Sequence, residues 1–444
     1  MHVVERFAGF AEGYRRQAVA PQVLHQAKRA VIDWYAALFP GSVVPPATLL
    51  ERSLAEEIGW GPSRLADGRL AGVRAAALIN GAAAHTVEVD DIYRDGIYHP
   101  GAPTIAAALA VAQSRGATGE AVLRAVIVGY EISTRIAEAM GRAHYRYWHN
   151  TGTIGGFGAA SAAAELLGLE RRPFAHALAT VATFSAGLQQ AFRSDSMSKP
   201  MHAGRAAEAG VIAALAAAEG VTGALDIMEG EVGYGRAMGE GPDWEHALAT
   251  LGEDFHICRM TFKNHACCGH AFAAIDGALA LKERMGVAAE DIARVRVGGY
   301  RATLEVAGIA DPATAAEARF STPYLVATAL THGSVRLAAF EPARLEDPAT
   351  RALMRRVEVV LDPALDAAFP AQRAARVAIE SRDGRRGEHL QPTRKGDPDM
   401  PLSDAELEHK YLELASPVLG EERARGLLAR LWRLESETQL SSSP

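Results

Sequence analysis

One short segment of this chain concentrates side chains that can bind a metal, act as a nucleophile or transfer a proton. The sequence "KNHACCGH", residues 263–270, holds one lysine, two histidines and two of the chain's three cysteines. Cys267 and Cys268 are adjacent, whereas structural zinc sites usually space their cysteines two to four residues apart, which argues against a metal. A reactive thiol at Cys268 stays open, since a helix beginning there and Lys263 would both lower its pKa. A segment that holds Lys263 beside an anion-binding site is the better interpretation.

A second polar cluster, "HTVEVDDIYRDGIYHPGAP" at residues 85–103, combines carboxylates with a histidine in a turn-rich stretch. Glu88, Asp90 and Asp91 cannot share one helical face, so we expect some of them to cap a helix or to point into a cleft. His99 follows in the same stretch. The alternative is a solvated acidic loop, although functional residues are enriched on loops.

Two further segments place basic side chains at the expected starts of helices. In "WHNTGTIGGFGAASAAAE", residues 148–165, His149 precedes a glycine-rich turn, and free N–H groups near Thr151 are expected to hold a carboxylate or a phosphate. In "SMSKPMHAGRAAEAG", residues 196–210, Lys199 adds positive charge to the positive end of a helix, so an anionic ligand is expected to compensate it. The alternatives are a structural histidine and an exposed lysine. Together the clusters predict an anion site with proton-transfer groups and no nucleotide motif.

The elements that must position these side chains fall into three parts. Up to about residue 250 the chain consists of Ala-rich segments with helical spacing, separated by Gly and Pro turns. Strand patterns follow in "DIARVRVGGY", "VEVVLD" and "ARVAIESRDGRRGEHL", the last with an Asp-Gly turn between two strands. The end of the chain is helical again and opens on a Ser-x-x-Glu capping box. We therefore predict a helical domain at 1–268, an α+β domain at 269–395 and C-terminal helices at 396–444 that return to the helical domain.

The composition limits the class of protein. The chain has 444 residues, 49% of them hydrophobic, and a net charge of −7, which argues against general binding to nucleic acid or to a membrane surface. Three cysteines fit a reducing compartment rather than a disulfide framework. The N-terminal residues lack the apolar core of a signal peptide, so a cytoplasmic location is expected.

Five motifs occur in the order found in the MmgE/PrpD family, which the chain resembles over nearly its whole length. They are "INGAAAHTVEVDD…HPGAP", "HNTGTIGGFGAASAAAELLGL", "SMSKPMHAGRAAEAGVIAALAAAEG", "TFKNHACCGHAFAAID" and "ARFSTPYLVATALTHG". The resemblance implies a large all-helical domain with a smaller α+β lid, an active site in the cleft between them, a homodimer, and neither a metal nor an organic cofactor. It also implies a small di- or tricarboxylic acid as the substrate.

The resemblance also implies roles for individual residues. The predicted catalytic residues are Lys199, His149, His99, Lys263 and Asp90. The predicted substrate-binding residues are Glu88, Asp91, Thr151, Cys268 and His270. The chain departs from the family pattern at Glu88, where Asp is frequent, at Ile92, where Thr or Val is frequent, and at Phe272, where a histidine often stands; the loop from Glu88 to His99 is also one residue longer than in the decarboxylases of the family.

Three functions compete on this evidence. The first is a cofactor-independent lyase, a dehydratase or decarboxylase that transfers a proton at a carbon next to a carboxylate. The second is an epimerase or isomerase of a polycarboxylate such as iminodisuccinate, which needs two opposed bases and no leaving group. The third is a non-catalytic protein that binds a polycarboxylate, suggested by Ile92 and Phe272.

Overall fold

The computed structural model describes residues 1–193 and 196–440, and they form two compact units. The first unit combines Met1–Thr261 with the C-terminal segment from Ser403, and the second is Phe262–Leu402. The first unit is helical and the second has an α+β fold, so the predicted fold class is confirmed. The second unit starts before the predicted boundary at 269, so Lys263 and Cys268 belong to it.

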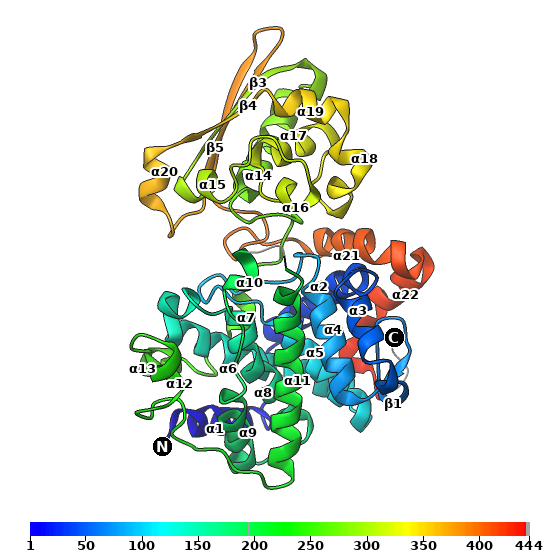
Figure 1. Ribbon diagram of the computed structural model, residues 1–444, viewed down its shortest axis with the longest axis vertical. Coiled ribbons are helices and arrows are strands. Elements are labelled where there is room, and N and C mark those ends of the chain that lie inside the picture. The colour runs from blue at the N-terminus through cyan, green and yellow to red at the C-terminus, as the bar shows by residue number, and fades with distance from the viewer. Residues whose placement is uncertain (194–195, 441–444) are drawn as a thin grey trace. The chain divides into compact units, whose positions relative to one another are not determined.

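The helices of the first unit pack around a core of small side chains. Helix α11 lies against α4, α8, α9 and α5, and its many alanine and glycine residues allow this close packing (Figure 1). The helices are α1 (Val3–Tyr14), α2 (Pro21–Ser42), α3 (Ala47–Ser53), α4 (Val73–Ala84), α5 (Gly101–Arg115), α6 (Gly119–Tyr145), α7 (Asn150–Thr153), α8 (Gly155–Leu166), α9 (Arg171–Ala182), α10 (Gln190–Arg193), α11 (Ser198–Ala218), α12 (Tyr234–Met238), α13 (Trp244–Ala249), α21 (Asp404–Leu419) and α22 (Glu421–Leu431).

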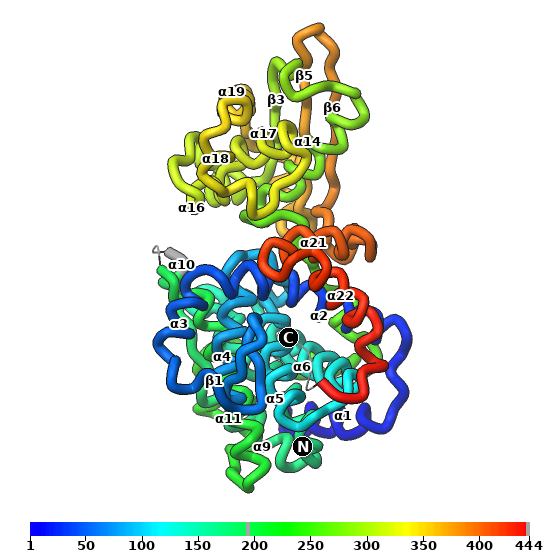
Figure 2. The backbone as a smooth tube through the Cα atoms, turned by 90° about the vertical axis from the view of Figure 1, so that its right-hand side faces the viewer, coloured from blue at the N-terminus to red at the C-terminus, as the bar shows by residue number. Residues whose placement is uncertain are grey.

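The C-terminal helices pack on the N-terminal part of the same unit. Helix α21 contacts α2 over much of its length, and both views show the red C-terminal helices beside the blue α2 (Figures 1 and 2). The predicted capping box at the start of α21 is present, with Ser403 Oγ accepting from Glu406 N at 3.2 Å. The segment from Ser403 belongs to the same compact unit as Met1–Thr261.

A small sheet in the first unit departs from the expectation of helices alone. Strands β1 (Ile58–Arg64) and β2 (Leu70–Ala71) pair antiparallel around a turn at Asp67-Gly68. Gly68 has φ +87°, a conformation that glycine adopts at no steric cost. Strand β1 contains two glycines and a proline, so its sequence carries little strand propensity.

The second unit is built on a four-stranded sheet in the order β4-β3-β5-β6. Strand β3 (Ile292–Gly299) pairs parallel with β4 (Val357–Leu361) and antiparallel with β5 (Ala375–Ser381), which forms a hairpin with β6 (Arg386–Gln391). All four predicted strands and the Asp-Gly turn are confirmed. Helices α14 and α17 pack on this sheet (Figure 1). The unit's helices are α14 (Phe272–Met285), α15 (Arg301–Glu305), α16 (Ala315–Ala318), α17 (Thr322–His332), α18 (Pro342–Leu345), α19 (Pro348–Met354) and α20 (Pro363–Ala368).

Among the described residues, no helix has both the length and the apolar character that crossing a bilayer requires.

Candidate active site

The acidic cluster lies between helices α4 and α5 of the first unit, and buried side chains from distant helices fix its backbone. The Lys410 ammonium on α21 donates to Val89 O at 2.7 Å and to Asp33 Oδ1 at 2.5 Å. Ile92 and Thr261 exchange two backbone hydrogen bonds of 2.9 Å each. The segment is therefore held on both sides, and the interpretation as a solvated acidic loop is wrong for its buried carboxylates.

A buried carboxylate shared by two histidines is the main feature of this segment. His85 Nδ1 lies 2.7 Å from Asp90 Oδ2, and His99 Nδ1 lies 3.1 Å from the same oxygen. Although burial raises the pKa of the Asp90 carboxyl, the charges and hydrogen bonds of His85 and His99 bring it well below its usual value. An ionised carboxylate can only accept, so His85 presents Nδ1–H to it and keeps its Nε2 lone pair when neutral, while His99 places Nδ1 at ion-pair distance from the same oxygen.

Two further histidines, His149 and His202, extend the cluster from His85. The His149 ring stacks on the His85 ring with centroids 5.4 Å apart, and His149 Nδ1 lies 3.0 Å from His202 Nδ1. The His99 ring meets the His85 ring edge-on, with centroids 4.7 Å apart. Burial, together with the charges of His85, Lys199, His99 and His202, holds the pKa of His149 well below its usual value. His149 is therefore neutral at neutral pH, and its conjugate acid is a strong proton donor.

The lysine at the start of α11 has a protein partner. Lys199 Nζ forms an ion pair with Glu88 Oε1, and both side chains are partly buried. Glu88 has φ +61°, an uncommon conformation for a residue with a side chain. The anion expected to compensate the charge of Lys199 is thus supplied at least in part by Glu88.

Two of the amides that were expected to be free at the glycine-rich turn, those of Gly152 and Thr153, form hydrogen bonds within the chain. Gly152 N and Thr153 N both donate to His149 O, at 2.8 and 3.1 Å, because a four-residue helix, α7, precedes α8. Thr151 is fully buried, and its hydroxyl accepts from His99 N at 3.3 Å. The prediction that the amides of residues 152 and 153 bind an anion is therefore wrong, and the Thr151 side chain instead links His99 to α7.

The Asp91 side chain contacts helices α5 and α6. Its carboxylate accepts from Tyr130 Oη at 2.7 Å and from Gly101 N at 3.0 Å. Burial, with the nearby charge of Asp33, raises the pKa of Asp91 to about 8. These contacts fix the start of α5, next to His99.

The remaining predicted residues lie in the second unit. Lys263 is buried, and the His270 ring contacts Tyr300 Oη through Nδ1 at 2.9 Å. Burial, followed by the charges of Arg373 and Arg394, lowers the pKa of His270 to about 4. Cys268 is half-buried, and its backbone N–H donates to Arg319 O at 2.9 Å.

The helix after these residues begins later than expected. Helix α14 starts at Phe272, whereas the sequence suggested a start at Cys268-Gly269. The expected lowering of the Cys268 pKa by a helix N-terminus therefore has no structural basis. Phe272 is fully buried and meets the His265 ring edge-on at 5.2 Å, while His265 Nε2 pairs with Asp276 Oδ1 at 2.8 Å.

The three side chains around Asp90 are also a candidate set of metal ligands. His85, Asp90 and His99 each offer a donor atom within 4.8 Å of the others. Two ligands about 2.0–2.2 Å from a tetrahedral ion lie roughly 3.3–3.6 Å from each other. The separations of 2.7 and 3.1 Å are those of a hydrogen bond and an ion pair and are shorter than the spacing of two ligands on one ion, so the arrangement fits a carboxylate–histidine cluster better than a metal centre.

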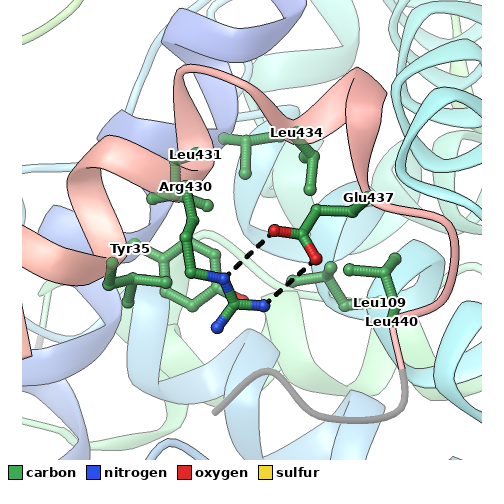
Figure 3. Close-up of a pocket in the computed structure, with 9 residues that line it drawn as sticks. Tyr35, Leu109, Arg430, Leu431, Leu434, Glu437 and Leu440 are labelled. Atoms are coloured by element: carbon green, nitrogen blue, oxygen red, sulfur yellow. Dashed lines mark hydrogen bonds and ion pairs between the residues drawn. The ribbon is translucent and has the colours of Figure 1, made fainter.

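A separate small pocket in the first unit lacks this chemistry. It lies under the C-terminal helices, where Arg430 Nε pairs with Glu437 Oε1 at 3.2 Å (Figure 3). Its lining is otherwise mainly apolar: Val31, Tyr35, Leu109, Leu427, Leu431, Leu434 and Leu440. The pocket contains no histidine, lysine or cysteine.

Comparison with known proteins identifies the family. The model of the MmgE/PrpD N-terminal domain matches residues 5–247, and that of the MmgE/PrpD C-terminal domain matches residues 265–434. The chain therefore belongs to the MmgE/PrpD family.

Its relatives include lyases that act on a tricarboxylic acid. The cis-aconitate decarboxylase-like protein oryM of Aspergillus oryzae is 28% identical, over 95% of this chain and 92% of its own length. The cis-aconitate decarboxylase of Homo sapiens is 26% identical over 98% and 92%, and that of Aspergillus terreus is 25% identical over 99% and 94%.

Two members of the cluster, His85 and His202, were not among the predicted site residues. Both stand inside the quoted motifs, His85 five residues before Asp90 and His202 three residues after Lys199. On a helix, residues three apart share a face, so the spacing of Lys199 and His202 carried a usable signal. His85 had no such signal, because its partners follow in an irregular segment.

Proposed function

We propose that this protein is a cofactor-independent lyase that decarboxylates a tricarboxylic acid of the cis-aconitate class. The observation that carries the proposal is the buried Asp90 carboxylate shared by His85 and His99, with His149 stacked beside them. The relatives that match this chain over nearly its full length are cis-aconitate decarboxylases or resemble them by name.

Decarboxylation requires a proton at carbon, and His149 and His99 are the proposed proton-transfer groups. When CO₂ leaves, the electron pair of the broken C–C bond stays on the substrate, and a new C–H bond must form there. His149 is the proposed proton donor: it is neutral in the free protein, takes up a proton when the polyanionic substrate binds beside it, and its imidazolium then releases that proton readily to carbon. The reaction takes up one proton and removes none from the substrate, so His99, with Nδ1 3.1 Å from Asp90 Oδ2, is proposed to accept a proton from solvent and return it to the site after each turnover.

Positive charge stabilises the negative charge that develops on the substrate. Lys199, beside Glu88 at the start of α11, supplies it in the first unit. Lys263 of the second unit stays a predicted catalytic residue, and Cys268 and His270 stay predicted substrate-binding residues; Lys263→Ala measures the contribution of the lysine.

The experiment is a substrate panel in D₂O followed by NMR. Purified protein is incubated with cis-aconitate, citrate, 2-methylcitrate and iminodisuccinate. We expect CO₂ release and one deuterium in the product from cis-aconitate. Loss of water from citrate or 2-methylcitrate would make the protein a dehydratase, deuterium uptake without a new product an epimerase, and ligand protection alone a binding protein.

Variants connect this activity to the cluster. His149→Asn and Lys199→Met are expected to lower kcat by about 100-fold or more, the size typical of losing an acid–base or electrostatic group. His409→Asn is the control, because His409 is an exposed histidine on α21 of the same unit. Near-normal rates in both variants would refute the assignment of the site.

We also propose a homodimer, on the basis of the family resemblance. Light scattering at several protein concentrations tests it, and a mass of one chain throughout would contradict it.

A further inference from the structure

His202 lies beside His149 in a space that stays open because residues 152 and 187 are glycines and have no Cβ atom. A Cβ atom on Gly187 would lie 3.2 Å from His202 Nδ1, and one on Gly152 would lie 3.0 Å from His202 Cβ. Gly187 also accepts the backbone hydrogen bond of His149 N at 2.9 Å. The same residues that place the His149 backbone therefore leave room for the His202 ring.

The contact between the two Nδ1 atoms can hold only one proton, carried by one nitrogen and accepted by the other. Their Nδ1 atoms are 3.0 Å apart, and each nitrogen is either an N–H donor or a lone-pair acceptor. Two N–H groups facing each other would repel, and two lone pairs would leave the contact without a hydrogen bond. Only one arrangement of donor and acceptor at a time is stable, so the proton states of the two rings are coupled.

We propose that His202 is a positioning residue that engages Nδ1 of His149, so that Nε2 is the nitrogen of His149 that exchanges a proton with the substrate. The inference rests on the proposed role of His149 as proton donor. His202 acts toward His149 as Asp90 acts toward His99, but as a neutral ring in place of a carboxylate.

The two histidines have neighbours of different charge. His99 lies with Nδ1 3.1 Å from the Asp90 carboxylate. His149 instead faces groups that are neutral or positive: His85 at the end of α4, His99 beyond it, and Lys199 and His202 on α11. Glu88 pairs with Lys199 and reduces the repulsion between that lysine and His149.

Three substitutions at residue 202 separate positioning from simple packing. His202→Ala removes the contact, and we expect kcat to fall about 10- to 100-fold with KM little changed, as for other residues that orient a catalytic group. His202→Asn places an amide where Nδ1 stands and is expected to restore most of that loss. His202→Asp introduces a carboxylate and is expected to shift the pH at which His149 titrates in the kcat profile upward.

An NMR readout makes the inference testable without turnover. In protein labelled with ¹⁵N-histidine, the Nδ1 shift of His149 is expected to change in His202→Ala and to be largely restored in His202→Asn. His409→Asn serves as the matched control and identifies one exposed histidine in the spectrum. Unchanged His149 shifts in His202→Ala, or equal kcat values for the Ala and Asn variants, would overturn the inference. An inactive wild type whose shifts respond as expected would instead overturn the proposed function alone.

Discussion

The buried carboxyl of Asp91 makes the stability of the first unit depend on pH in a direction opposite to that of most aspartates. Its pKa is raised to about 8, whereas an aspartate in an unfolded chain has a pKa of about 3.9. Between these values the folded protein binds one proton more than the unfolded protein at this residue. The stabilisation is fully present below pH 4 and is lost as pH rises towards 8.

Asp91→Asn is the perturbation that isolates this effect. The asparagine carbonyl can still accept from Gly101 N, but the amide does not titrate. One proton corresponds to about 1.4 kcal/mol per pH unit, so the wild type is expected to lose about 2.7 kcal/mol relative to the variant between pH 5 and pH 7. Groups that titrate equally in both proteins cancel in this difference.

Tryptophan fluorescence in urea is the suitable assay. All five tryptophans, Trp34, Trp60, Trp148, Trp244 and Trp432, lie in the first unit, so the signal follows the unit that contains Asp91. Asp226→Asn, at an exposed position of the same unit, is the matched control and should track the wild type. Parallel pH dependence of wild type and Asp91→Asn between pH 5 and 7 would refute the reasoning.

Three further predictions concern the support of the site. Lys410→Met leaves the buried Asp33 carboxylate and Val89 carbonyl without their ammonium, and should lower the free energy of unfolding by about 3–5 kcal/mol in the fluorescence assay. Adding Asp33→Asn should recover a large part of that loss, and an additive further loss would contradict the explanation. Glu88→Gln removes the anion that competes with substrate for Lys199, so KM for cis-aconitate should fall by up to about fivefold at low salt; an increase would show that Glu88 assists binding. Dialysis against EDTA should leave the activity unchanged, and recovery of lost activity by added metal would disprove cofactor independence.

Local sequence patterns were sufficient to predict most helices and strands of this fold. Helical spacing and the Ser403–Glu406 capping box predicted the C-terminal helix, and alternation around Asp383-Gly384 predicted the β5–β6 hairpin. These signals lie within a few residues of each other, where dihedral preferences and neighbouring hydrogen bonds act. Two expectations failed. Strand β1 forms although its two glycines and proline carry little strand propensity, and α14 begins at Phe272 rather than at Cys268-Gly269.

The identity of the residues that meet at the site depended on tertiary structure. The sequence by itself determined the family motifs, the helical and α+β parts, and the histidines, lysines and carboxylates available for proton transfer. Only the folded chain brings Lys199 to Glu88 across 111 residues and Lys410 to Asp33 across 377. Burial then decided the proton states, because removing a charge from water shifts a pKa according to the partners that surround it. For Asp90 those partners are two histidines, and for Asp91 they are a tyrosine, a backbone amide and a second carboxylate.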